Sequence, residues 1–303
     1  MKKKKTAAKA AKTLQKKPTT RKTAKKLSPR APVKAAAGGT IISRSEPAPV
    51  VVENAKGKGK CVIVCDHASN LVPRSLNNLG LGKTELKKHI AWDPGTQDIG
   101  RYISAKMDAP LVLATYSRLV VDLNRGPDAP ECMRPESDHI AIPGNENLSP
   151  GHKKQRLDEI FWPYHRAIDG QLQRFLDKGV APLLLSLHSF TPQMDGFKRP
   201  WHIGVLWNKE EGIARRLVDS LRKNNPQIRV GENEPYSLKA ANVTKNTVST
   251  HAESRGLPYV IVEFRQDLVG TAAGARKWAG LFLKSLQPIL DDPHLYRLAR
   301  DRK

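Results

Sequence analysis

The chain has 303 residues, 39% of them hydrophobic, which is enough for the core of one large domain or two small ones. No apolar run approaches the roughly eighteen residues that a membrane-spanning helix needs, and no apolar segment typical of a secretory signal follows the opening lysines. The three cysteines are an odd number at spacings that fit neither a disulfide framework nor a zinc finger. We therefore expect a protein of the reducing cytoplasm with no membrane partner.

The net charge of +23 is concentrated near the N-terminus. Residues 1–45 contain fifteen lysines and arginines and no carboxylate, whereas the rest of the chain has 37 basic and 29 acidic side chains, a net of +8. Such a segment buries too little apolar surface to offset the entropy of ordering it. We predict a disordered basic tail and linker over residues 1–57 and a folded domain over residues 58–303. The tail is either a solvated extension or a non-specific tether for nucleic acid and other polyanions.

After the linker, short apolar runs alternate with longer amphipathic segments. The runs that predict buried strands are Cys61–Cys65, Leu111–Ala114, Leu119–Leu123, Pro182–Leu187, Ile203–Leu206 and Tyr259–Glu263. The segments that predict helices are Thr96–Met107, His152–Lys178, Glu210–Asn224 and Gly270–Leu286. This alternation predicts an α/β fold of three layers, with helices on both faces of a central, largely parallel sheet. Residues 128–149 are rich in Pro, Asp, Glu and Asn, and predict a long surface excursion placed to cover a site.

Polar side chains follow three of the predicted strands. His67 comes just after the first strand, His188 directly follows Leu187, and Glu263 ends the last strand. Ligands of open α/β sheets bind beyond the carboxyl ends of the strands, so we expect these side chains to share one site. Histidine and carboxylate ligands are typical of catalytic zinc, which activates water while a separate glutamate takes the proton. The pattern predicts metal-assisted hydrolysis, with His67 and His188 as zinc ligands and Glu263 as the base.

The third metal ligand has two candidates. Asp93 is a carboxylate just before a predicted helix, where the alternative role is to cap that helix. Asn70 follows His67 by three residues, but a neutral amide is a poorer zinc ligand than a carboxylate. We therefore predict Asp93 as the ligand.

The segment 116–126 predicts an anion site. Arg118 precedes its apolar run and Arg125 follows it, and a guanidinium can bind a carboxylate through two parallel hydrogen bonds. Asn124 adds an amide donor next to Arg125. The alternative is that both arginines form surface ion pairs.

Five motifs in order resemble the N-formylglutamate amidohydrolase family over about residues 60–290. They are Cys65–Asn70 followed by Val72 and Pro73, then His89–Gly95, Ser117–Arg125, Leu187–Ser189 and Glu263–Asp267. The family is similar to zinc carboxypeptidases and deacylases, so the resemblance implies a mixed sheet rather than a purely parallel one. It also implies hydrolysis of the amide of an N-acylated acidic amino acid, typically N-formyl-L-glutamate to formate and L-glutamate.

The resemblance implies roles at the metal. His67 and His188 fall where the related peptidases have two zinc-binding histidines, and Glu263 falls where they have the catalytic glutamate. Asn70 departs from the pattern, because those enzymes carry a metal-binding glutamate at its position. We expect Asn70 to contact the substrate instead.

Further contacts with the substrate are implied elsewhere. Asn124 and Arg125 match an Asn–Arg pair that binds the free carboxylate of the substrate, and Arg118 is expected to polarise the scissile carbonyl. His251 is expected to line the pocket, although it lies near the end of a predicted helix that Gly256 would terminate, which is an alternative structural role.

Two other functions are compatible with parts of the sequence. One is a nucleic-acid-associated protein that uses its tail, with a hydrolase-like domain as a scaffold. The other is a binding module that has lost its metal, which the joint presence of His67, His188 and Glu263 disfavours. We predict a zinc-dependent amidohydrolase that acts on a small anionic N-acyl amino acid.

Overall fold

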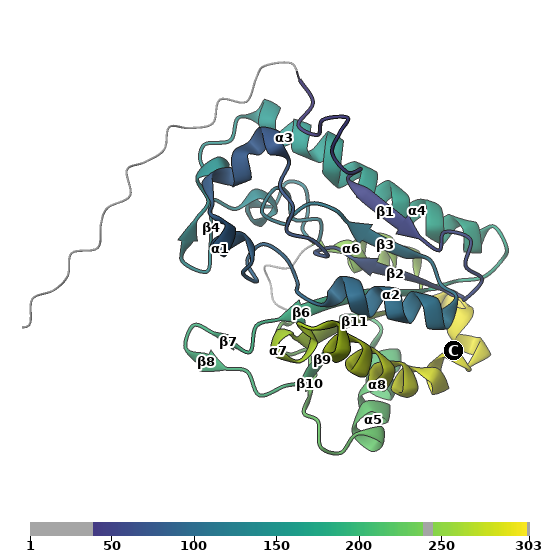
Figure 1. Ribbon diagram of the computed structural model, residues 1–303. Helices are drawn as coiled ribbons and strands as arrows, with labels where there is room; N and C mark the ends of the chain where they lie inside the picture. Colours follow the sequence, from purple (N-terminus) through teal and green to yellow (C-terminus); the bar gives the residue numbers. More distant parts are fainter. Residues whose placement is uncertain (1–38, 239–244, 302–303) are drawn as a thin grey trace, which may run out of the picture. The chain divides into compact units, whose positions relative to one another are not determined.

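The computed structural model describes residues 39–238 and 245–301 (Figure 1). Most of the predicted tail lies outside these residues, so its disorder and its binding of polyanions stay predictions. Within the predicted linker, however, β1 (Val50–Glu53) forms the edge strand of the main sheet, and the buried Ile41 donates its backbone N–H to Glu159. The folded part therefore begins before residue 58. The sequence did not predict β1, because its three valines form a run too short to indicate a strand.

A mixed sheet of seven strands lies at the centre of the described residues, in the order β1-β3-β2-β6-β11-β9-β10. The further strands are β2 (Cys61–Cys65), β3 (Leu111–Ala114), β6 (Leu183–Phe190), β9 (Ile203–Leu206), β10 (Val230–Glu232) and β11 (Tyr259–Arg265). Strands β3, β2, β6 and β11 are mutually parallel, whereas β1 is antiparallel to β3 and β9 is antiparallel to β11. The predicted α/β fold with a mixed, mostly parallel sheet is thus confirmed.

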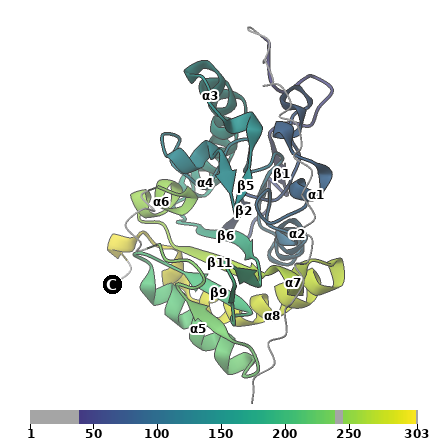
Figure 2. The same cartoon turned by 90° about the vertical axis from the view of Figure 1, so that its left-hand side faces the viewer.

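Helices cover both faces of this sheet (Figure 2). Successive side chains of β2 point alternately into two hydrophobic clusters, one on each face of the sheet. Ile63 packs in the cluster that contains residues of α2 (Thr96–Met107), α5 (Glu211–Asn224) and α8 (Ala272–Leu290). Val62 and Val64 belong to the opposite cluster, which contains α4 (Trp162–Leu176). Because both faces are buried, the central strands do not show the alternation of polar and apolar residues that a half-exposed strand has.

Short elements complete the described residues. They are η1 (Arg74–Gly80), α1 (Lys83–Leu86), η2 (Pro130–Met133), β4 (Glu136–Ser137), β5 (Ile140–Ala141), η3 (Pro143–Asn145), α3 (Pro150–Arg156), the π-helical turn η4 (Leu157–Phe161), β7 (Gln193–Met194), β8 (Phe197–Lys198), α6 (Thr247–His251), η5 (Glu253–Arg255), α7 (Gln266–Val269), η6 (Pro293–Tyr296) and η7 (Ala299–Asp301). The single helix predicted over residues 152–178 is therefore α3, η4 and α4 in succession. Within the described ranges, no helix has both the length and the apolarity needed to cross a bilayer.

The strand predicted at Leu119–Leu123 is wrong. These residues form turns and irregular backbone beyond the end of β3, although four of the five are apolar and all are buried. Burial on all sides produces the same apolar run as a central strand does, so the sequence alone does not separate the two. The backbone N–H of Asp122 donates to the carbonyl of Cys132 in the excursion, at 2.7 Å, instead of to a neighbouring strand.

Candidate active site

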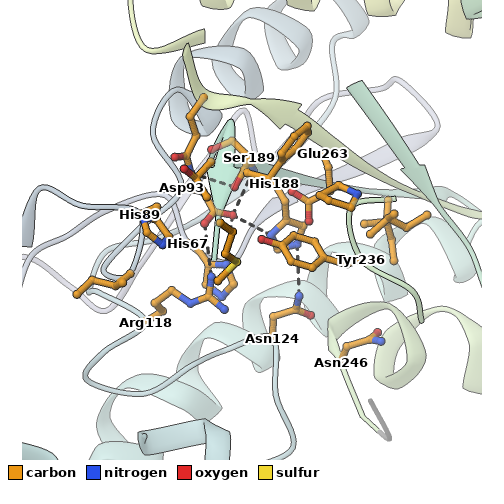
Figure 3. Close-up of a pocket in the computed structure, with 18 of the residues that line it drawn as sticks. His67, His89, Asp93, Arg118, Asn124, His188, Ser189, Tyr236, Asn246 and Glu263 are labelled. Atoms are coloured by element: carbon orange, nitrogen blue, oxygen red, sulfur yellow. Dashed lines mark hydrogen bonds and ion pairs between the residues drawn. The ribbon is translucent and has the colours of Figure 1, made fainter. Parts of the chain in front are cut away.

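Three buried side chains converge at one end of the sheet (Figure 3). His67 follows β2, Asp93 precedes α2, and His188 lies in β6. Asp93 Oδ2 lies 3.3 Å from His67 Nδ1 and 3.0 Å from His188 Nδ1. The backbone N–H of Asp93 also donates to the carbonyl of His67 at 2.9 Å, which fixes the two segments to each other. The structure thus brings together the three predicted metal ligands.

Asp93 does not cap the helix that follows it. The N-cap of α2 is Gly95, and no side chain donates or accepts a capping hydrogen bond there. The carbonyl of Asp93, not its carboxylate, accepts from the Thr96 hydroxyl at 2.8 Å. Gly95 has φ +86°, and a Cβ there would lie 2.4 Å from the carbonyl oxygen of Val269, so only glycine fits this turn. The turn leaves the Asp93 carboxylate directed at the histidines.

The second nitrogen of each histidine faces another buried carboxylate. His67 Nε2 lies 2.8 Å from Asp122 Oδ1, and His188 Nε2 lies 3.2 Å from Asp66 Oδ2. The Asp122 carboxylate accepts the Nε2 proton of His67, whereas His188 Nε2 also lies 3.0 Å from the Ser186 hydroxyl, and the Nδ1 atom of each ring is directed toward Asp93. Histidines that bind a metal are held in this way, with the remote N–H donated to a carboxylate. No spacing typical of metal ligands singles out Asp66 and Asp122 in the sequence, so our prediction did not include them.

The three convergent atoms fit a zinc ion. Ligand atoms about 2.0–2.1 Å from a tetrahedral zinc lie about 3.3 Å from one another. The distances of 3.0 and 3.3 Å from Asp93 Oδ2 to the two Nδ1 atoms are close to that value. Two imidazoles and one carboxylate also leave the fourth position that a catalytic zinc keeps open. The buried triad of His67, Asp93 and His188 is therefore a candidate metal site.

The charge balance of this cluster supports the same assignment. With neutral imidazoles, the buried Asp66, Asp93 and Asp122 carry three negative charges. Among residues 39–238 and 245–301, Arg118 is the one lysine or arginine paired with them, at 2.7 Å from Asp122 and 3.6 Å from Asp93. Burial lowers the pKa of His188, but hydrogen bonds to Asp66 and Asp93 raise it well above its usual value. The cluster thus stabilises added positive charge at the histidines, and a divalent cation would balance it.

Glu263 lies beside the triad on β11, in register with His188 on β6. Its carboxylate is buried, and among the described residues its Oε2 has no hydrogen-bond partner. Burial raises the pKa of Glu263 to about 7, against the opposing effect of His188. A buried carboxylate that titrates near neutrality and has a free oxygen can both accept and return a proton.

The triad and Glu263 line a cavity of about 440 Å³. Arg118, Asn124 and Arg125 line the same cavity, as predicted. The Nε and one terminal nitrogen of Arg118 donate to Asp122 Oδ2 at 3.0 and 2.7 Å. The Asn124 side-chain oxygen accepts from the backbone N–H of Thr247 at 3.0 Å, so the start of α6 fixes its orientation.

Asn70 and His251 lie outside the cavity, which corrects their assignment as substrate contacts. The Asn70 amide donates to the carbonyl of Leu86 at 2.8 Å, because the turn after His67 directs it toward α1. His251 is buried against α4, with Nε2 2.7 Å from His165 Nδ1. Its place near β11 in the sequence does not bring it to the cavity, since α6 directs it toward His165 and Asp169 of α4.

The fold and this site define an α/β protein with a candidate metal centre of hydrolytic type. The sequence model of the N-formylglutamate amidohydrolase family matches residues 59–269. A crystal structure of a gene product from Agrobacterium tumefaciens is 33% identical, covers 82% of this chain and 99% of its own, and has a TM-score of 0.75. The chain belongs to the N-formylglutamate amidohydrolase family, which confirms the predicted resemblance.

A more distant structure shares the fold. The N-formylglutamate amidohydrolase from Ralstonia eutropha is 18% identical, covers 81% of this chain and 98% of its own, and has a TM-score of 0.55. No curated protein sequence matches the chain. Membership of the family makes this protein an amidohydrolase, and the buried triad is its candidate metal site.

The role of Asp66 can be tested by Asp66→Asn. Tyr164 and Thr247 both donate hydroxyl protons to Asp66 Oδ1, at 2.9 Å, so the carbonyl oxygen of an asparagine must face them. Its NH₂ group then faces His188 Nε2 and moves the ring proton to Nδ1, the nitrogen that faces Asp93. We expect zinc affinity to fall by about 10- to 100-fold, measured by competition with a chelator. The exposed Asp98→Asn is the matched control, and unchanged affinity in Asp66→Asn would refute this role.

Proposed function

We propose that this protein is a zinc-dependent amidohydrolase that removes the acyl group from a small anionic N-acyl amino acid, with N-formyl-L-glutamate as the reference substrate. One observation carries the proposal: the buried His67–Asp93–His188 triad and the buried Glu263 line the same cavity, together with arginine side chains. Family membership supports the reaction class, amide hydrolysis.

The zinc ion, when bound by the triad, supplies a Lewis acid that activates water and polarises the amide carbonyl. Glu263 accepts a proton from the attacking water and delivers it to the nitrogen of the leaving amine. Burial raises the pKa of Glu263, which makes its carboxylate a stronger base for the first of these transfers. The water oxygen becomes bonded to the acyl carbon as the C–N bond breaks, which yields formate and the free amino acid.

The arginines hold the substrate in place. Arg125 and the Asn124 amide bind a carboxylate of the substrate, as the resemblance implies. Two nitrogens of Arg118 are held by Asp122, and its remaining terminal nitrogen lies 3.6 Å from Asp93 Oδ1. We assign this nitrogen to the scissile carbonyl, because it lies beside a metal ligand.

Formate release by the zinc-loaded full-length protein tests this function. We expect turnover of N-formyl-L-glutamate, with lower kcat/KM for the N-acetyl analogue and for N-formyl amino acids that lack a side-chain carboxylate. Absence of turnover with the whole panel would contradict the proposal.

A further inference from the structure

Two guanidinium groups in the cavity form no ion pair with a carboxylate of the described residues. Arg125 and Arg134 both line it, and neither forms an ion pair within the part of the chain that the structure describes. Arg125 donates one hydrogen bond, to the carbonyl of Asn124 at 2.8 Å. Arg118, by contrast, is already neutralised by Asp122. Of the three arginines that line the cavity, Arg118 is thus paired with a carboxylate, whereas Arg125 and Arg134 are not paired with any carboxylate of the described residues.

The backbone of Arg134 is fixed relative to the metal site. Two residues before it, the carbonyl of Cys132 accepts from the N–H of Asp122 at 2.7 Å. The carbonyl of Arg134 itself accepts from the side chain of the buried Asn145 at 2.9 Å. Asp122 also binds His67, so the same residue links the metal triad to the segment that carries Arg134. These hydrogen bonds hold the backbone of Arg134 in a defined position beside the triad.

The surroundings of Arg134 favour an anion. Burial lowers the pKa of its guanidinium, and although Asp122 opposes this, the nearby Arg118 and Arg125 lower it further. An arginine stays charged under these conditions, and a partly buried cation without a partner costs free energy. A ligand with one carboxylate would leave one of the two guanidinium groups unpaired. A ligand with two carboxylates would satisfy both.

We propose that Arg134 binds the side-chain carboxylate of the substrate, so that the site selects N-acyl amino acids with an acidic side chain. The inference rests on the proposed function. Asn124 Nδ2 lies 3.5 Å from His188 Nε2, so the Asn124–Arg125 pair is next to the metal triad. The α-carboxylate is one carbon from the scissile amide, and that pair binds it. Arg134 lies in the excursion of residues 128–149 and binds the carboxylate that is farther from the scissile amide.

The test compares N-formyl-L-glutamate with N-formyl-L-glutamine, in which the side-chain carboxylate is an amide, and with N-formyl-L-isoglutamine, in which the α-carboxylate is an amide. For R134Q we expect kcat/KM on the glutamate substrate to fall by about 10- to 100-fold, mainly through KM, which is the range for losing a charged hydrogen bond. On the glutamine substrate, R134Q and wild type should differ by less than about threefold. R125Q should lower kcat/KM on both the glutamate and the glutamine substrate. On N-formyl-L-isoglutamine, which lacks the α-carboxylate, R125Q and wild type should not differ.

Two further variants sharpen the comparison. R134K keeps the charge and should restore part of the preference for glutamate, whereas the exposed Arg166 on α4, changed to glutamine, should alter nothing. An equal loss for R134Q on all three substrates, or no loss on glutamate, would overturn the assignment.

Binding separates this inference from the proposed function. If wild type hydrolyses none of the three compounds, the proposed function fails, but calorimetry of the same compounds still tests Arg134. Tighter binding of N-formyl-L-glutamate than of N-formyl-L-glutamine by wild type, lost in R134Q, supports the inference. Equal binding of both compounds by wild type overturns it.

Discussion

Replacing Glu263 with glutamine is expected to reduce amide hydrolysis by at least about 100-fold while zinc stays bound. Glutamine has the shape of glutamate but cannot take a proton from water. Glu263 is not one of the three residues whose ligand atoms converge. Its Oε2 accepts no hydrogen bond from the described residues, so the substitution breaks no hydrogen bond of that oxygen. The loss should therefore appear in kcat, with KM for N-formyl-L-glutamate changed little.

Steady-state kinetics and zinc content of the same preparations check this result. Glu232→Gln on β10 is a matched control, because this carboxylate pairs with Arg215 and Arg222 and does not line the cavity. It should leave kcat unchanged. If Glu263→Gln is as fast as wild type, Glu263 is not the base.

Replacing either histidine of the triad with alanine is expected to abolish stoichiometric zinc binding. Each variant removes one of three protein ligands and takes an imidazole away from two buried carboxylates: Asp93 and Asp122 in His67→Ala, Asp93 and Asp66 in His188→Ala. Zinc per chain, measured by mass spectrometry after dialysis, should fall from about one to below about one tenth. Circular dichroism of each variant shows whether the fold survives.

A second group of metal-ligand type provides the control for this experiment. Asp138, His139 and Asp195 also bring ligand atoms within 4.8 Å of one another, but all three are exposed. His139→Ala should keep zinc, since the buried site is the one that the surrounding carboxylates support. Full zinc in both His67→Ala and His188→Ala, with loss in His139→Ala, would move the metal to the exposed group.

The sequence predicted the metal triad because strand ends meet at one edge of an α/β sheet. His67 and His188 follow or end apolar runs, and a carboxylate at Asp93 precedes a helix. What it did not predict is the support behind them. Asp122 is hydrogen-bonded to the far ring nitrogen of His67, and Asp66 lies 3.2 Å from the far ring nitrogen of His188. Nothing in local spacing distinguishes such a carboxylate from one at the surface.

Errors in the prediction share a physical origin. The buried turns of 119–123 have the composition of a central strand, and only long-range hydrogen bonds show the difference. Asn70 and His251 are close in sequence to site residues, but their direction depends on turns and helix packing. Arg134 lies in an irregular excursion without periodicity, so only the folded chain brings it to the cavity.

Formate release from N-formyl-L-glutamate, before and after removal of metal, tests the central claim most directly. The full-length protein is treated with a chelator, dialysed and divided, and one half is reloaded with one equivalent of zinc. The account predicts turnover that disappears in the stripped half and returns with zinc. Undiminished turnover in protein shown to contain no metal, or none in the zinc-loaded protein, would contradict it.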